Sequence, residues 1–371
     1  MLGAGFSRAA GLPLGNELFA EVIDAAKQTV LWENLLKPDL LRYALFVRRT
    51  TGVRLSLAEV AADFERFMSF LDIEHTLRLT GSAWTNKGNK SQMIVRNFIA
   101  EVLYRRQARM NGEAKQFYDD FARKLDSTDM VITFNYDTVL EDALDRVGIR
   151  YRLFPSRFKE VDEWGGGAFA DQDDEVAILK MHGSIDWFDK SDFDEQCRDW
   201  KKKGLPGVPP DEIFSTDEFE LQPLIDGIYP ESPLTTIYRI RNLNHYLSWA
   251  SMVRDAPVLI SPSFSKILYI NPVSEFWFSF GSLGRWTRKL VIIGFSMPSH
   301  DEYVRQGIYS VIRNFQHMKL GKSTPKSRLK LVDFRRSAKA VAEYRQTYSF
   351  VDWRHTDVFL DGFNPSTLRH I

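Results

Sequence analysis

The sequence contains a single cysteine, Cys197, among its 371 residues. One cysteine excludes an intramolecular disulfide and any zinc site built from several thiolates. Net charge is also lacking, because 49 Lys and Arg residues balance 49 Asp and Glu residues. A chain without an excess of positive charge is not typical of a dedicated nucleic-acid-binding protein, so we expect no direct nucleic-acid partner.

Long apolar runs are absent as well. No run approaches the ~20 residues that a membrane-spanning helix needs, and the first residues do not resemble a signal peptide. We therefore expect a cytoplasmic protein without membrane contact. Hydrophobic residues still make up 44% of the chain, which is enough for a sizeable core and excludes wholesale disorder. At ~150 residues per domain, the length predicts two or three domains, or one domain with a large insertion.

Short apolar runs that are rich in β-branched residues predict strands. Each is followed by a polar or glycine-containing turn, and they are Met130–Phe134, Ala177–Met181, Val258–Ser261, Leu290–Gly294 and Leu329–Phe334. Helical patterns lie between them, at Thr138–Val147, Pro272–Lys289, Asp301–His317 and Arg336–Tyr348. This alternation predicts the α/β class, with a doubly wound, mostly parallel, Rossmann-like sheet covered by helices on both faces.

Two stretches depart from the alternation. The first contains helical patterns such as Leu57–Glu74 and Ser91–Gln107 and no convincing strand, so we predict a helical insertion subdomain over residues 17–125. The sheet domain then comprises residues 1–16 and 126–371. The second stretch, residues 189–235, is rich in proline, glycine and charge, which predicts a surface excursion between two strands.

The first chemical signal is the glycine loop Gly3-Ala4-Gly5-Phe6-Ser7. Two glycines separated by one residue let the backbone approach a pyrophosphate, whose charge would face the amides of a following helix. The dehydrogenase fingerprint is not met, because Arg8 stands where its third glycine belongs and Asp24 lies in an amphipathic helical pattern rather than at a strand end. A hydride-transfer dehydrogenase is therefore disfavoured. Only Met1 and Leu2 precede the loop, so the preceding strand is either unusually short or begins upstream of the sequence given.

Polar and glycine residues follow the carboxyl ends of four predicted strands. They are Asn135 and Asp137, His182, Gly294 and Ser296, and Asp333. Because α/β sheets bind ligands at the carboxyl ends of their strands, these residues predict one common cleft. Each also has a structural alternative. Asn135 and Asp137 would serve as helix caps, His182 as a buried structural histidine, and Asp333 as a capping or solvated acid.

Four motifs carry a specific resemblance: GAGFS at 3–7, TFNYD at 133–137, KMHGSIDW at 180–187 and GFSMPSHD at 294–301. In this order they resemble the sirtuin-type NAD-binding domain, and more closely the bacterial sirtuin-like NADases of antiphage defence. The resemblance extends from Gly3 to about Asp333. The chain departs from the deacetylase branch, whose zinc module needs four cysteines and whose glycine loop continues to a Pro-x-Phe-Arg segment instead of Pro13-Leu14-Gly15-Asn16.

This resemblance implies an NAD+ hydrolase that cleaves the nicotinamide–ribose bond, with NAD as substrate and no metal. Asn135 would hold the ribose hydroxyls or the attacking water, His182 would act as general base, and Asp137 would orient these groups or add negative charge near the sugar. The residues implied to cradle the pyrophosphate are Gly3, Ala4, Gly5 and Ser7, and those implied to face the adenosine half are Gly294, Ser296 and Asp333.

The resemblance also implies a restrained antiphage effector, since uncontrolled hydrolysis would deplete the host's own NAD. We therefore expect a homo-oligomer and a separately encoded partner such as a HerA-type ATPase. Two other functions stay open. One is a scaffold that binds NAD or ADP-ribose without chemistry, and the other is an NAD-dependent protein deacylase.

Overall fold

The computed structural model describes residues 1–79, 84–85, 88–170, 174–248, 255–260, 263–264, 271–278, 280–298, 301–318 and 326–371. Its strands are β1 (Trp84–Thr85), β2 (Gly88–Asn89), β3 (Met130–Thr133), β4 (Tyr151–Arg152), β5 (Phe158–Val161), β6 (Gly167–Phe169), β7 (Val176–Lys180), β8 (Trp187–Asp189), β9 (Leu221–Pro223), β10 (Ile237–Ile240), β11 (Val291–Ile293), β12 (Leu329–Val332) and β13 (Thr356–Phe359). Its α-helices are α1 (Gly15–Lys27), α2 (Lys37–Thr51), α3 (Leu57–Ala62), α4 (Phe64–Leu77), α5 (Lys90–Ala108), α6 (Gly112–Ala122), α7 (Val139–Val147), α8 (Ser191–Lys202), α9 (Leu243–Ser248), α10 (Ser274–Phe278), α11 (Glu302–His317), α12 (Ala338–Thr347) and α13 (Pro365–Leu368).

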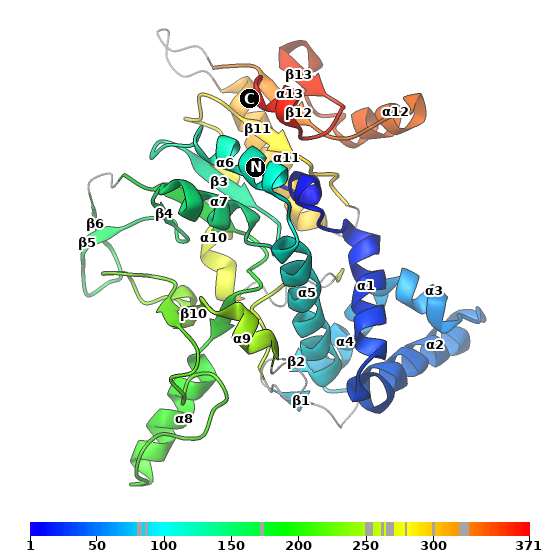
Figure 1. The fold of residues 1–371 in the computed structure, drawn as a ribbon, viewed down its shortest axis with the longest axis vertical. Coiled ribbons are helices and arrows are strands. Elements are labelled where there is room, and N and C mark those ends of the chain that lie inside the picture. Colours follow the sequence, from blue (N-terminus) through cyan, green and yellow to red (C-terminus); the bar gives the residue numbers. More distant parts are fainter. Residues whose placement is uncertain are drawn as a thin grey trace.

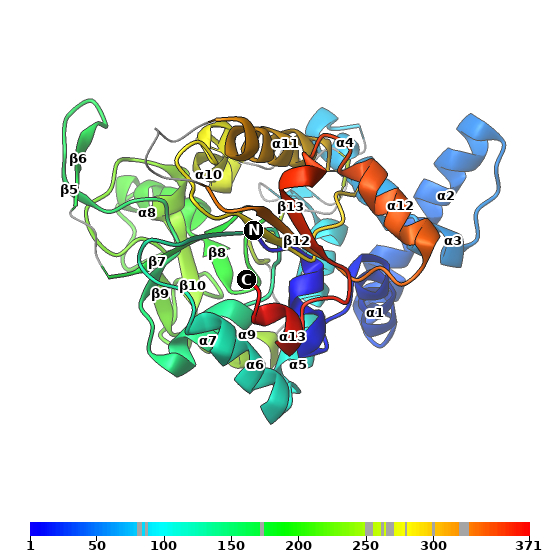
Figure 2. The same ribbon diagram turned by 90° about the horizontal axis from the view of Figure 1, so that it is seen from above.

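A parallel sheet runs through the centre of the molecule in two groups of three strands, β4–β7–β3 and β11–β12–β13. All five residues of β7, the apolar run Val176–Lys180, are buried. Such strands suit a sheet that is covered on both faces. In Figures 1 and 2, α10 and α11 lie on one side of this sheet and α6 and α7 on the other. The predicted doubly wound, Rossmann-like α/β fold is thereby confirmed.

The residues before the glycine loop join the two groups of strands. Leu2 forms parallel bridges with Thr133 of β3 and with Ile293 of β11. Its N–H donates to Ile132 O at 2.8 Å, and the next N–H, that of Gly3, donates to Ile293 O at 2.9 Å. Residues 1–3 therefore occupy the position of a central strand. The sheet continues from this position to β3 on one side and to β11 on the other. Such a position is the topological switch point of an α/β sheet, where ligands bind.

Most of the predicted elements are present with shifts of one or two residues. The runs at 130–134, 177–181, 290–294 and 329–334 form β3, β7, β11 and β12. The helical patterns at 138–147, 301–317 and 336–348 form α7, α11 and α12. The edge strand β13 was not anticipated.

Two predicted elements are wrong. Within the described part of Val258–Ser261, which ends at Ile260, only an isolated antiparallel bridge forms, between Leu259 and Gly183. The described backbone of this run bonds to the turn after β7 and to Trp187 of β8 instead of joining the parallel sheet. The predicted helix Pro272–Lys289 is broken into α10 flanked by short 3₁₀ turns, and Gly284 at φ 83° ends the pattern in a conformation that a helix does not contain.

The helical character of residues 17–125 is confirmed for α1 to α6, with the small antiparallel pair β1 and β2 as an addition. Helices α1 to α5 gather at one end of the molecule (Figure 1). Whether this region is a separate subdomain stays a prediction. The segment 189–235, whose character as a surface excursion stays a prediction, connects β8 to β10, which pair antiparallel, and it includes the short strand β9, which also pairs with β10. It carries α8, which extends away from the rest of the chain in Figure 1.

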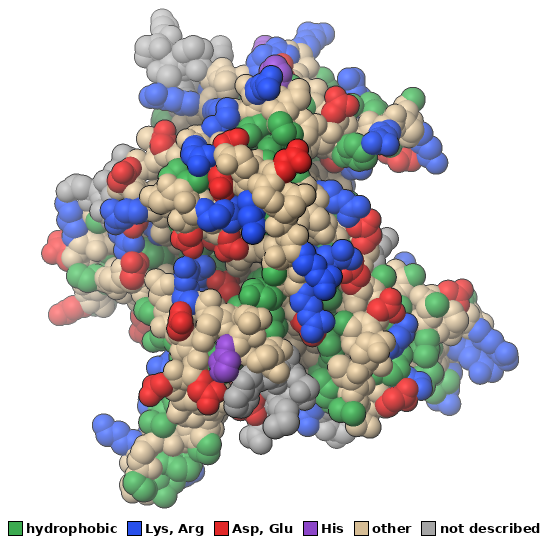
Figure 3. All heavy atoms as spheres, in the orientation of Figure 1, with side chains coloured by type: hydrophobic (Ala, Val, Ile, Leu, Met, Phe, Trp, Pro, Cys, Tyr) green, Lys and Arg blue, Asp and Glu red, His purple; other side chains and the backbone are tan. Residues whose placement is uncertain are grey.

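The surface matches the balanced composition. On the face drawn in Figure 3, Lys and Arg side chains are intermingled with Asp and Glu side chains. Within the described residues, no helix is both long and apolar enough to cross a bilayer.

Candidate active site

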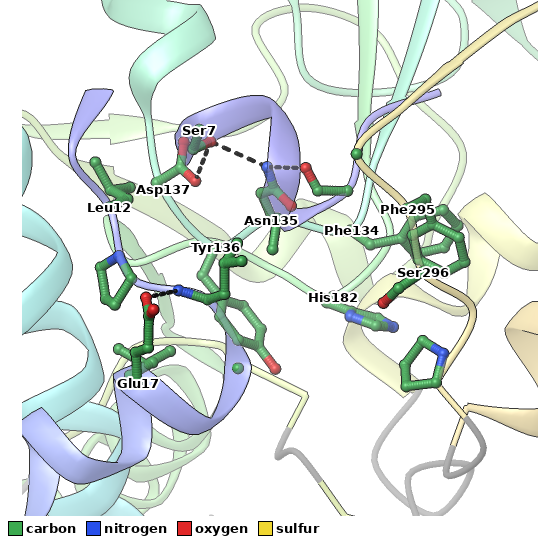
Figure 4. Close-up of a pocket in the computed structure, with 18 of the residues that line it drawn as sticks. Ser7, Leu12, Glu17, Phe134, Asn135, Tyr136, Asp137, His182, Phe295 and Ser296 are labelled. Carbon is green, nitrogen blue, oxygen red and sulfur yellow. Dashed lines mark hydrogen bonds between the residues drawn. The ribbon is translucent and has the colours of Figure 1, made fainter. Parts of the chain in front are cut away.

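A cavity of about 470 Å³ opens at the carboxyl ends of β3, β7 and β11, next to the glycine loop (Figure 4). This volume lies within the range of ~300–1,000 Å³ that is typical of small-molecule sites. Eight of the ten predicted site residues line it: Gly3, Ala4, Ser7, Asn135, Asp137, His182, Gly294 and Ser296. The helical region completes the cavity, with lining residues from α1, α4 and α5 that include Glu17, Glu65 and Leu103.

The glycine loop packs directly onto the loop after β11. The N–H of Gly5 donates to Gly294 O at 2.9 Å. A Cβ added to Gly5 would lie 2.6 Å from Gly294 Cα, and one added to Gly294, whose φ is 63°, would lie 2.4 Å from Gly5 Cα. Neither position has room for a side chain. Gly5 therefore shapes the cavity from behind, without lining it, by letting the two backbones touch.

The amide of Asn135 has a defined orientation. Its Nδ2 donates to Gly3 O at 3.0 Å and to Ser7 Oγ at 3.1 Å. A backbone carbonyl only accepts hydrogen bonds, so the nitrogen, and not the oxygen, faces Gly3. Both N–H groups of the amide are thereby used, and no described residue donates to its oxygen (Figure 4). Asn135 thus offers the cavity a hydrogen-bond acceptor.

Ser7 connects this amide to a buried carboxylate. Its Oγ donates to Asp137 Oδ2 at 2.8 Å, while the other oxygen of Asp137 accepts from Val139 N–H at 3.2 Å. Asp137 therefore binds the first N–H of α7, whose N-cap residue is Thr138, and is also linked directly to the site. Burial raises the pKa of Asp137, and the nearby positive charge of Lys180 opposes that rise.

Lys180, at the end of β7, holds the segment that carries Asp137 in place. Its side chain is fully buried, and its ammonium group donates to the backbone carbonyl of Asp137 and pairs with Glu141 at 2.6 Å. Burial raises the pKa of Glu141, which the charge of Lys180 opposes. The pair thus fixes the chain after β3 to the chain after β7, the two segments that carry Asn135 and His182.

His182 is held by its backbone as well as by its ring. Its carbonyl accepts from Ile260 N–H at 2.9 Å, and the preceding N–H, that of Met181, donates to Thr133 O at 2.9 Å. Gly183 follows at φ 80°, where a Cβ would lie 1.9 Å from Val258 O. Only glycine fits this turn, which is why the histidine is followed by glycine in the sequence.

The ring of His182 is buried, with 5% of the residue exposed. It lies edge-on to Phe134, with ring centroids 5.4 Å apart. Its Nε2 lies 2.8 Å from the hydroxyl of Tyr303 on α11. Burial strongly raises the pKa of Tyr303, so the hydroxyl stays protonated at neutral pH.

A second buried ion pair supports the turn after His182. Asp186 accepts from Ser184 Oγ and from Arg239 Nε, the latter at 2.8 Å. Burial pushes the pKa of Asp186 up, but the charges of Arg239 and Lys180 outweigh it and bring the pKa below its usual value. Asp186 is therefore ionised, and it ties the turn to β10.

The described lining of the cavity is acidic. It contains four carboxyl groups, from Glu17, Glu65, Asp137 and Asp301, of which Glu17 pairs with Arg8 outside the lining, and among the residues that the structure describes there it contains no Lys or Arg. A cationic group is favoured at such a surface. An anionic group would depend on backbone N–H groups, such as those of the glycine loop.

Asp333, the remaining predicted site residue, follows β12 but does not line the cavity. Its carboxylate accepts from Phe334 N–H at 2.7 Å and lies 3.0 Å from Arg335. Burial raises its pKa, and the charge of Arg335 opposes this. Its role toward a ribose stays a prediction.

Sequence reasoning missed several residues of this site, namely Glu17, Glu65, Lys180, Asp301 and Tyr303. Signals were available for Lys180 and for Asp301, which closes the motif at 294–301. A lysine that ends a strand with no exposed residue needs a buried carboxylate as partner. Glu17, Glu65 and Tyr303 come from helices whose position over the cavity depends on tertiary packing. Among the described residues, there is no group of three or more His, Cys, Asp or Glu side chains suited to a metal ion.

Comparison with protein families gives one match. The model of the SIR2-like domain family matches residues 129–199, a segment that runs from β3 through β7 into α8 and contains Asn135, Asp137 and His182. The match supports a sirtuin-like family and an NAD-related function for the chain. No curated protein matches the sequence.

Proposed function

We propose that this protein is an NAD+ hydrolase that releases nicotinamide and ADP-ribose. One observation carries the proposal. Asn135, whose amide oxygen accepts from no described residue, lines the same cavity as His182, beside the glycine loop and at the switch point of the sheet. These are the groups that the chemistry of a dinucleotide requires, namely a backbone cradle for phosphate, an acceptor and an imidazole.

In the proposed reaction, water adds to the anomeric carbon of the nicotinamide ribose. The bond to the pyridinium nitrogen breaks, and its electron pair stays on the departing neutral nicotinamide. Positive charge builds on the sugar during this step, much as in glycoside hydrolysis. Asn135 accepts a hydrogen bond from the attacking water or from a ribose hydroxyl, and His182 accepts the proton that the water or hydroxyl gives up.

The acidic lining supports binding of NAD+ with its nicotinamide ribose in this cavity. Carboxylates favour the cationic pyridinium and the positive charge that develops on the ribose. Ser7 connects the amide of Asn135 to the buried carboxyl group of Asp137. The pyrophosphate would lie against residues 3–7, where backbone amides provide the counter-charge.

The test is nicotinamide release from NAD+ by the purified protein. We expect Asn135→Ala to lower the rate by about 100- to 1,000-fold, the usual effect of removing one group that stabilises a transition state, while calorimetry shows unchanged affinity for NAD. Binding without release, with every partner tested, would favour a scaffold. Formation of O-acetyl-ADP-ribose from an acetylated peptide would favour a deacylase.

We further propose that the enzyme is a restrained antiphage effector that depletes cellular NAD. Such an activity must be held in check, by a homo-oligomer or by a separately encoded partner such as a HerA-type ATPase. Co-expression with the product of the neighbouring gene, followed by phage challenge, tests this role. Protection should be lost in Asn135→Ala. Protection that survives this substitution would rule out NAD depletion as its cause.

A further inference from the structure

The contact between Tyr303 and His182 is the feature that the proposed reaction leaves unexplained. Tyr303 is the second residue of α11 and lies 121 positions from His182 in the sequence, yet the two side chains share a hydrogen bond of 2.8 Å at Nε2. His182 is buried, and Tyr303 is largely so. A hydrogen bond between a ring nitrogen and a largely buried partner restricts both the direction of the ring and the location of its proton.

The position of Tyr303 is itself fixed by the loop that carries His182. Its ring lies 4.8 Å from the ring of Trp277, centroid to centroid. The indole Nε1 of Trp277 donates to the carbonyl of Met181, the residue before His182, at 3.3 Å. The contacts therefore form a closed circuit from His182 through Tyr303 and Trp277 back to Met181.

The backbone around His182 leaves only the ring to be oriented. The carbonyl of His182, the N–H of Met181 and the tight turn at Gly183 are each held by neighbouring segments. A neutral imidazole has one N–H and one lone pair, and the hydrogen bond at one nitrogen decides which form the other takes. The hydrogen bond with Tyr303 at Nε2 thus favours one form of the ring in which His182 meets a ligand.

We propose that Tyr303 is a positioning residue for His182, whose imidazole it holds in one rotamer and one tautomer through Nε2. The proposal rests on the proposed NAD+ hydrolysis, in which His182 accepts a proton. Tyr303 does not line the cavity and acts through His182. His182 can accept a proton at Nδ1 only when Nε2 carries the ring proton, so in this proposal Nε2–H donates to the hydroxyl oxygen of Tyr303, and the tyrosine itself stays protonated throughout the neutral pH range.

The test begins with nitrogen NMR of the imidazole rings in histidine-labelled full-length protein. The His182 signals are identified by their loss in His182→Gln. We expect the wild type to show His182 mainly as the Nε2–H tautomer and Tyr303→Phe to shift the ratio of the two tautomers. The control is Tyr309→Phe, which removes a hydroxyl from an exposed position on the same helix, and it should leave the His182 signals unchanged.

Kinetics supply the second readout. We expect kcat for nicotinamide release to fall about 10- to 100-fold in Tyr303→Phe with KM nearly unchanged, the usual consequence of losing a group that orients a reacting one. Averaged tautomers in the wild type would overturn the proposal without any variant. So would wild-type imidazole signals and wild-type kcat in Tyr303→Phe. If the variant alters the imidazole signals but the wild type releases no nicotinamide, the positioning contact stands and the proposed hydrolysis fails.

Discussion

Gly5 and Gly294 lie in backbone contact, joined by a hydrogen bond of 2.9 Å although 289 positions separate them in the sequence. Because this contact brings the phosphate-loop candidate against the loop after β11, the shape of the cavity depends on it. We predict that Gly294→Ala destabilises the fold by about 2–5 kcal/mol, from the cost of a left-handed backbone and from overlap with Gly5. Urea denaturation measures this loss. The control is Gly112→Ala, where an added Cβ would meet no atom within 4 Å. This substitution should leave the free energy of unfolding nearly unchanged.

We predict that Ser7→Ala weakens the reaction through Asn135. The substitution removes one of the two acceptors of the amide and leaves Asp137 Oδ2 without its donor, at a cost of about 1–3 kcal/mol. The rate of nicotinamide release should fall, but by less than in Asn135→Ala. The double variant should be no slower than Asn135→Ala alone, because both changes act on one hydrogen-bonded chain. Rate losses that multiply would contradict this coupling.

Lys180→Met should be strongly destabilising. It leaves Glu141 buried without its partner, and breaking such a pair from one side usually costs about 3–5 kcal/mol. Adding Glu141→Gln should restore part of the loss, since the unpaired charge is then gone. Lys202→Met, at an exposed pair with Asp199, is the matched control and should have little effect on the urea midpoint. Equal losses in the two lysine variants would argue against a buried ion pair.

The pair formed by Asp186 and Arg239 makes stability depend on pH. The folded state lowers the pKa of Asp186, so its contribution is fully present above the unfolded pKa of about 4 and is lost as the pH falls through the folded value. At neutral pH, Asp186→Asn should cost about 3–5 kcal/mol, because Arg239 stays buried without a counter-charge. The difference from the wild type should shrink as the pH falls below about 4. Denaturation curves at neutral and acidic pH test this, and a difference that grows toward low pH would refute it.

The fold was predictable wherever local pattern and tertiary environment agree. The run Val176–Lys180 is apolar enough to be read as a strand buried on both faces, and Thr138–Val147 has helical spacing and a glycine just after its end. Val258–Ser261 has the composition of a strand, but its backbone bonds to the turn at His182. Composition does not reveal which partner such a run will choose.

The site residues that directly follow strands were predictable, and those that the helices bring to the cavity were not. Asn135, Asp137 and His182 follow strands directly, so the topology of a parallel sheet brings them together. Three helices bring acidic side chains to the same cavity: α1 carries Glu17, α4 carries Glu65, and Asp301 is the N-cap residue of α11. Tyr303 reaches His182 from the third of these. Whether these residues reach the cavity depends on how the helices pack over the sheet, and the spacing of residues along one helix does not encode that packing.

The amide orientation at Asn135 has a consequence for discrimination among ligands. Because both of its N–H groups donate to the chain, this side chain can accept a hydrogen bond from a ligand but cannot donate one. A ligand that places an ether oxygen, a fluorine or a carbonyl oxygen there has no hydrogen to donate, and its lone pairs repel those of the amide oxygen. The site should therefore discriminate against sugars whose hydroxyl is replaced in this way, at the same atom that accepts a hydrogen bond from a hydroxyl or water.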